Sequence, residues 1–207
     1  VEGGGNVDCT IETPAAEIAA ECAVAGSASA TGEDAVAIGA GAEASGDFSV
    51  ATGASALASG EGSIALGSNA HAFDQGSVAV GAKSHADGFG STAVGFWAYA
   101  TSEGATAVGD ASTAQGIRTT AVGQDAYTNA DYATALGVDA QALEYGASAV
   151  GVEAEAAGFF SAAFGAGAES TGDFSTALGG YSHAEGFNAT ALGSFADASG
   201  TNSVALG

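Results

Sequence analysis

The chain has almost no positive charge. Lys83 and Arg118 are its two basic residues, against 24 acidic ones, and the formal net charge is −22. Such a surface repels the phosphates of nucleic acids and the anionic headgroups of membranes. No apolar run approaches the roughly 18 residues of a membrane-spanning helix. We therefore exclude nucleic acid as a partner and direct membrane insertion of this chain.

Large aliphatic side chains are also scarce. Leu, Ile, Val and Phe together make up 36 of 207 residues. A chain so poor in these residues and so highly charged is usually disordered unless something else organises it. The apolar fraction of 47% consists mostly of alanine, which fills a core only where two backbone layers come close together. This composition excludes a thick globular interior and predicts a thin fold.

Methionine is absent, and the N-terminus begins Val1-Glu2-Gly3 without a start residue or a signal pattern, which suggests a processed or trimmed chain. The two cysteines, Cys9 and Cys22, lie in residues 1–22, the segment that does not repeat. A disulfide between them, within one chain or between chains, would clamp a small cap and indicates an oxidising, extracellular compartment. Two free thiols are the alternative.

Glycine, in contrast, is abundant and recurs at a fixed interval of fourteen residues. An interval that never slips by one residue indicates a solenoid in which each unit of fourteen residues is one turn. We call this glycine position 0 of its turn. It occurs thirteen times, as Gly39, Gly53, Gly67, Gly81, Gly95, Gly109, Gly123, Gly137, Gly151, Gly165, Gly179, Gly193 and Gly207.

The residues around each glycine alternate in size with a period of two, as in a β-strand. Position −2 is alanine in all thirteen turns and −4 is Ala, Ser or Thr, whereas −1 is large in every turn except at Thr52. Positions +3 and +5 are again small, while +2 and +4 vary. A second glycine at +7 in most turns predicts a reversal with φ > 0. Each turn is therefore predicted to hold two short strands and two corners, which makes the fold all-β.

The large residues at position −1 would form an apolar stripe on the outside of a single chain. Burying such a stripe contributes several kcal/mol per few turns, at about 25 cal/mol per Å². Three chains around one axis is the simplest closed arrangement that hides one stripe per chain, so we predict a homotrimer. The predicted trimer interface comprises Ile38, Leu66, Val80, Val94, Val108, Val122, Leu136, Val150, Phe164, Leu178, Leu192 and Leu206.

The units Gly62-Ser63-Ile64-Ala65-Leu66-Gly67, Gly76-Ser77-Val78-Ala79-Val80-Gly81 and Asn202-Ser203-Val204-Ala205-Leu206-Gly207 resemble the head repeat of trimeric autotransporter adhesins, the YadA-like head. The resemblance extends over residues 23–207. It implies a left-handed parallel β-roll that is trimeric, extracellular and displayed on a cell surface, and that adheres to host matrix, other cells or surfaces. The chain shows no neck or heptad stalk, so we expect its anchor to be missing from this sequence.

Residues 1–22 match no head pattern. We expect them to cover the exposed end of the first turn, because a solenoid end is an open sheet edge. In the alternative, this segment docks onto the end of a second trimer, and the protein is a structural filament subunit that polymerises head to tail.

Aromatic residues at positions +2 and +4 point away from the alanine core. Exposed rings on a rigid face favour ligand contact, with protection of neighbouring turns as the alternative. The predicted ligand face comprises Trp97, Tyr99, Tyr127, Tyr181 and Phe195. A second group of rings follows position +7, where we expect contacts with neighbouring chains: Phe48, Phe159, Phe160, Phe174 and Phe187.

Acidic residues stack at position +2 in Asp125, Asp139 and Glu153. Like charges at this spacing cost about 1 kcal/mol per pair even in water. Calcium binding or a saline habitat would relieve the repulsion, but solvation alone is the simpler interpretation. His71, His85 and His183 share position +4 and are expected to be solvated, because two ligands without a third nearby make a poor metal site. We predict no other cofactor.

No residues suggest an enzyme. The sequence contains no histidine beside a nucleophile, no phosphate-binding loop with a lysine, and no carboxylate pair outside the repeat. Thr92, Thr106, Thr120 and Thr134 form a threonine ladder at position −3, as in ice-binding solenoids. This ladder shares its face with the −1 residues, so only a monomer would leave it free to bind ice.

Overall fold

The computed structural model describes residues 22–24 and 27–207, which consist of short strands joined by turns. These residues divide into two compact units, one ending at Trp97 and the other beginning at Ala98. Cys9 and most of the predicted cap lie outside the described residues. The disulfide, the cap and the docking segment of the filament hypothesis therefore stay predictions.

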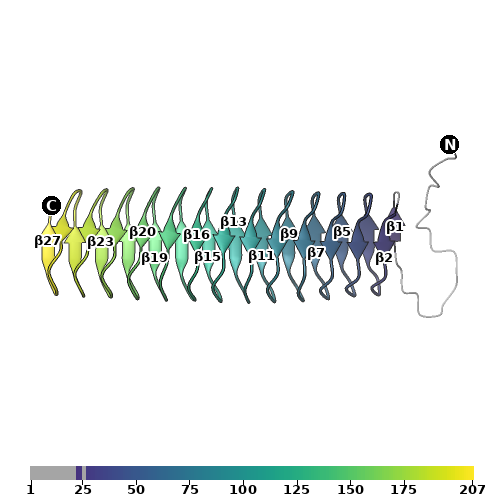
Figure 1. Ribbon diagram of the computed structural model, residues 1–207, viewed down its shortest axis with the longest axis horizontal. Coiled ribbons are helices and arrows are strands. Elements are labelled where there is room, and N and C mark those ends of the chain that lie inside the picture. Colours follow the sequence, from purple (N-terminus) through teal and green to yellow (C-terminus); the bar gives the residue numbers. More distant parts are fainter. Residues whose placement is uncertain (1–21, 25–26) are drawn as a thin grey trace. The chain divides into compact units, whose positions relative to one another are not determined.

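The first unit contains two parallel sheets, one on each side of the turn (Figure 1). The first sheet has the order β1 (Cys22–Val24), β3 (Val36–Ile38), β5 (Val50–Thr52), β7 (Ile64–Leu66), β9 (Val78–Val80) and β11 (Thr92–Val94). The second sheet has the order β2 (Ser29–Ala30), β4 (Glu43–Ala44), β6 (Leu57–Ala58), β8 (His71–Ala72) and β10 (His85–Ala86).

The second unit repeats this arrangement. Its first sheet has the order β13 (Thr106–Val108), β15 (Thr120–Val122), β17 (Thr134–Leu136), β19 (Ser148–Val150), β21 (Ala162–Phe164), β23 (Thr176–Leu178), β25 (Thr190–Leu192) and β27 (Val204–Leu206). Its second sheet has the order β12 (Tyr99–Ala100), β14 (Thr113–Ala114), β16 (Tyr127–Thr128), β18 (Gln141–Ala142), β20 (Glu155–Ala156), β22 (Glu169–Ser170), β24 (His183–Ala184) and β26 (Asp197–Ala198).

Strands pair with their counterparts one turn away, in register with the repeat. Ala51 pairs with Ala37 and with Ala65, and Ala121 pairs with Ala107 and Ala135. The hydrogen bonds continue through the corners, as when the Gly53 N–H donates to the Ile38 carbonyl at 2.8 Å. The predicted all-β parallel solenoid with turns of fourteen residues is confirmed.

The interior of each unit is built from methyl and hydroxyl groups. Between Ala35 and Ala198 the alanines at −2, such as Ala65 and Ala135, are buried, and so are the small residues at −4, +3 and +5. The largest fully buried side chains in the described residues are Thr119 and Thr128. Two backbone layers therefore lie against each other with only small side chains between them, as the composition predicts.

The glycine at position 0 is required for two separate reasons. Gly137 has φ +141°, a conformation that residues with a Cβ rarely adopt. A Cβ added there would also lie 2.2 Å from the carbonyl oxygen of Gly151, the equivalent glycine of the next turn. Because neither the backbone angle nor the close approach admits a side chain, glycine occupies this position in all thirteen turns from Gly39 to Gly207.

The prediction that the glycine at +7 has φ > 0 is wrong. Gly60 and Gly158 lie outside the positive-φ region, and the left-handed residue of this corner is at +9, as in Gly62 and Phe160. Glycine at +7 serves close approach instead, since a Cβ on Gly158 would meet the Gly172 carbonyl oxygen at 2.1 Å. With an ordinary backbone angle, this position accepts other residues in some turns, for example Glu144.

We predict that Gly67→Ala destabilises the protein by at least about 2 kcal/mol more than Gly76→Ala does. Gly67 has φ +143°, and a Cβ there would meet the Gly81 carbonyl oxygen at 2.4 Å. Gly76 has φ +66°, close to the φ of non-glycine residues such as Phe48, and a Cβ there would meet nothing within 4 Å. Thermal and urea unfolding followed by circular dichroism measure the difference. Equal losses of stability in the two variants would show that the contact between turns is unimportant.

Candidate functional site

The predicted trimer-interface residues lie on the outward face of the first sheet in each unit. In the second unit the strand register places Val108 beside Val122, and the series continues turn by turn to Leu206. We call the position −1 residues the apolar column. They are exposed or half-buried in the single chain, with Leu178 46% exposed. The column is therefore a continuous apolar surface within the unit.

The threonine ladder lies on this same face. Thr106, Thr120 and Thr134 occupy neighbouring strands and are half-buried, two residues before the apolar column in each strand. An ice-binding surface and a subunit interface would therefore compete for one face of the chain.

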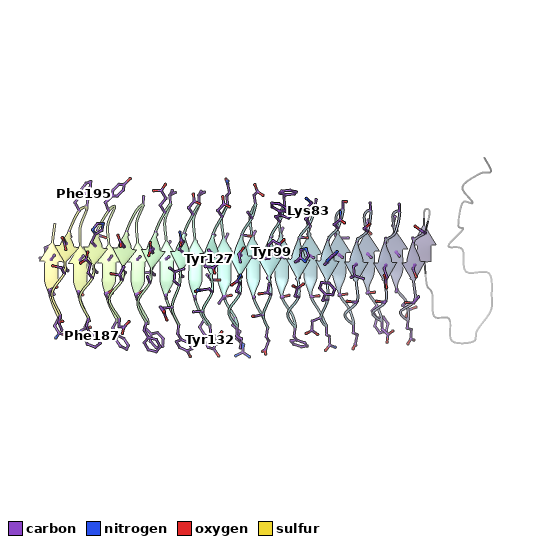
Figure 2. All side chains as sticks on the ribbon, viewed as in Figure 1. Lys83, Tyr99, Tyr127, Tyr132, Phe187 and Phe195 are labelled. Carbon is purple, nitrogen blue, oxygen red and sulfur yellow. The ribbon has the colours of Figure 1, made fainter. Side chains whose placement is uncertain are left out.

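The residues of the predicted ligand face do not form one continuous patch. Tyr99 and Tyr127 lie on the second sheet, separated by Thr113 on the intervening strand. Tyr181 and Phe195 stack at the corner formed by positions 0 to +2, which we call the first corner. Their ring centroids are 5.5 Å apart and their planes are 10° from parallel. Figure 2 shows Phe195 at one edge of the unit and Tyr127 over its strands. Trp97 belongs to the first unit.

At Trp97 the first unit contains a compact cation–π arrangement. The Lys83 Nζ lies 4.8 Å from the centroid of the Trp97 ring and 5.7 Å from that of Phe96, and these two rings stack on each other. Lys83 and Trp97 both occupy position +2 on successive turns. Aromatic faces at this corner therefore hold an ammonium group directly.

A larger aromatic cluster lies in the second unit at the corner formed by positions +7 to +9, which we call the second corner. Ring contacts run without interruption from Tyr132 through Tyr145 to Phe187, with centroids 4.7–6.1 Å apart. All its rings are 38–52% exposed. We call this cluster the aromatic ridge; it comprises Tyr132, Tyr145, Phe159, Phe160, Phe174 and Phe187.

Sequence reasoning identified three of the five consecutive turns of this ridge but missed Tyr132 and Tyr145. Aligning positions +8 and +9 would have found them, because each of these turns carries a ring at one position or the other. Figure 2 shows Tyr132 and Phe187, from the two terminal turns of the ridge, along the same edge of the unit.

Carboxylates are built into the second corner as well. The Oδ1 atoms of Asp131 and Asp173 accept hydrogen bonds from the backbone N–H groups of Ile117 and Phe159, at 2.9 and 3.0 Å. Each aspartate thus satisfies an N–H group of the preceding turn and is held at the corner by it.

The weak metal candidates Asp125, Asp139 and Glu153 lie at position +2 of successive turns, all with positive φ. Asp125 accepts a hydrogen bond from the Gln124 side chain at 3.1 Å. Within residues 22–24 and 27–207, no group of three His, Cys, Asp or Glu side chains is arranged to hold a metal ion.

Two histidines stack on neighbouring strands of the first unit. The His71 and His85 rings have centroids 4.6 Å apart, and burial together with the charge of His85 lowers the pKa of His71. Burial raises the pKa of Asp87, against the opposing effect of both histidines. His183 lies 3.7 Å from Glu169 in the second unit. The three histidines therefore lie beside ordinary surface partners rather than in a cluster of ligands.

We predict that His85→Gln raises the pKa of His71 towards its ordinary value of about 6.5, measured by NMR titration. Because the folded-state pKa of His71 is depressed, the unfolded chain binds this proton first, and stability should fall as the pH drops through about 6.5. His183→Gln, on a strand of the second unit, is the control. An unchanged pKa of His71 in the His85→Gln protein would contradict the proposed repulsion.

A family model described as the YadA head domain repeat (2 copies) matches residues 30–56, 58–84, 86–112, 114–140, 129–154, 156–182 and 184–207. Six of the seven matches are 26 or 27 residues long, about two turns of the solenoid. Comparison with curated proteins gave no significant match.

Heads of this family are trimeric, non-enzymatic adhesin domains exposed on the surface of bacterial cells. In the described part of the chain, no helix has the length and apolar content needed to span a membrane. The repeat interval, the parallel register and the matches over most of residues 30–207 agree, and the chain belongs to the YadA head repeat family.

Proposed function

We propose that this chain forms a homotrimeric, extracellular adhesin head that attaches a cell to matrix, to other cells or to surfaces. The observation that carries the proposal is the apolar column. It occupies the same face of every turn except that of Thr52, whereas the other outward positions vary more between turns. A subunit interface that runs along the whole solenoid requires similar residues in successive turns, whereas a ligand-binding surface does not.

The energetics of the column support association. Burying the remaining exposed surface of a half-exposed Val or Leu contributes about 1 kcal/mol. The second unit alone presents seven Val or Leu residues and Phe164 at this position, from Val108 to Leu206, so one chain gains about 8 kcal/mol. This gain is comparable to the estimated cost of about 4–15 kcal/mol for the translational and rotational freedom that chains lose on association. Burial of the apolar column of the first unit increases the gain further.

The outward side chains at the other positions also support an adhesive function. The turns present stacked side chains at fixed spacing, such as Glu155 beside Glu169 and His71 beside His85, in place of one enclosed site. Repeated, rigidly held groups favour many weak contacts with an extended partner, and many linked contacts give strong attachment. Function should therefore be spread over the turns of the head.

We predict that Val108→Asp dissociates the trimer, because three carboxylates would be desolvated at its axis without partners. Thr113→Asp is the matched control, since Thr113 is equally half-buried but lies on the second sheet. Sedimentation equilibrium should give one third of the wild-type mass for Val108→Asp and an unchanged mass for Thr113→Asp. A trimeric Val108→Asp protein would remove the column from the interface.

We expect beads coated with the protein to attach to extracellular matrix or to cultured cells, and beads coated with Val108→Asp to attach at least about tenfold less because multivalency is lost. Beads coated with Thr113→Asp should retain adhesion. Beads carrying an unrelated protein of similar acidity report attachment by charge alone. Equal retention of the trimeric protein and the unrelated acidic protein would contradict an adhesive function.

A further inference from the structure

We propose that the aromatic ridge of the second unit binds a cationic polypeptide segment in which Arg or Lys residues alternate with apolar ones. This inference rests on the proposed adhesin function and gives that function a ligand class and a location. The ridge offers six exposed rings in mutual contact, flanked by carboxylates.

The ridge is local, which separates it from the subunit interface. Outside the ridge this corner carries single apolar residues, Phe48, Phe89 and Ile117, separated by turns with polar residues such as Glu61, Gln75 and Glu103. The apolar column, in contrast, continues through nearly every turn. If this corner met a neighbouring chain in each turn, its apolar character would recur as the column does. The alternative expected from the sequence, that these phenylalanines contact neighbouring chains, does not explain why the uninterrupted ring contacts run through these five turns.

The ridge also carries a conformational cost. Tyr132, Phe160 and Phe174 have φ between 51° and 59°, in the left-handed region. Glycine and asparagine adopt this region at least cost, and both occur at the same position, as Gly146 and Asn188. Bulky rings at strained positions are typical of residues retained for a function other than stability.

The negative charge around the rings favours a cationic partner. Asp131 and Asp173 are fixed at the corner by their backbone hydrogen bonds, and the exposed Glu144 precedes Tyr145 in the chain. Arg118 lies one turn before Tyr132 and is already paired with Glu103 at 3.2 Å. The ridge is therefore an apolar surface with uncompensated negative charge, which favours a partner that brings both apolar contacts and cations.

The chain already uses this chemistry internally. At the first unit's corner, the Lys83 ammonium group lies over the Trp97 and Phe96 rings. The ridge offers comparable rings without an ammonium group of its own among the described residues. Its five turns extend over about 19 Å at about 4.8 Å per turn, which matches about six residues of an extended peptide.

The test uses the full chain and a fluorescent peptide of about eight residues with alternating Arg and Leu. Fluorescence anisotropy at about 0.15 M salt measures binding. We expect Phe160→Asn together with Phe174→Asn to weaken binding at least about tenfold, because two aromatic contacts are lost. Asparagine suits the backbone here, as Asn188 and Asn202 show at the same position. Phe48→Asn is the matched control: Phe48 has the same position and φ 59°, but lies in the first unit.

A second variant tests the charge. Glu144→Gln removes one carboxylate without changing the shape of the side chain and should weaken binding of the Arg–Leu peptide. Peptides alternating Glu with Leu, Ser with Leu, or Arg with Ser should bind more weakly than the Arg–Leu peptide, because each lacks one of the two required features.

Several results would overturn the inference. Failure of the Arg–Leu peptide to bind, or binding to the doubly substituted protein as tight as to the wild type, is one such result. Equal binding of the Ser–Leu or Arg–Ser peptide is another, because it would leave only hydrophobic or only charge attraction. A changed sedimentation mass of the double variant would assign the ridge to the subunit interface. Loss of peptide binding by a trimeric, adhesive protein rejects this inference alone, whereas a monomeric or non-adhesive wild type rejects the proposed function.

Discussion

The structure depends on the size of the side chains between the two sheets. Residues such as Ala65, Ala135 and Ser63 occupy the interior, and no fully buried side chain in the described turns is larger than threonine. Methyl-sized groups allow the layers to approach closely but bury little apolar area per turn. Stability must therefore come from the backbone ladders and from surfaces that the single chain leaves exposed.

The ladders in turn dictate where variation is allowed. At position 0 the next turn's carbonyl lies where a Cβ would be, so Gly67 and Gly137 cannot change, while the +2, +4, +8 and +9 side chains point outward. The repeat thus keeps its constant positions apart from most of its variable ones. We propose that assembly relies on the apolar column that recurs through the turns, and recognition on local groups such as the aromatic ridge.

Much of this architecture is predictable from the sequence, because a strict repeat converts one-dimensional spacing into spatial neighbours. The strands, the alanine core and the outward −1 residues follow from the alternation around each glycine. The corner geometry does not, since Gly60 is needed for close approach and not for its φ, and the left-handed position is held by Gly62 or by rings such as Phe160. The ridge was incompletely predicted because its rings alternate between two positions, so that neither column shows the whole cluster.

The most direct test of the account is the mass of the unmodified protein in dilute solution, by sedimentation equilibrium. An alanine-filled solenoid with an exposed Val and Leu column is predicted to be a trimer, with no folded monomer as the concentration is lowered. A stable, folded monomer with the column in water would contradict the central claim.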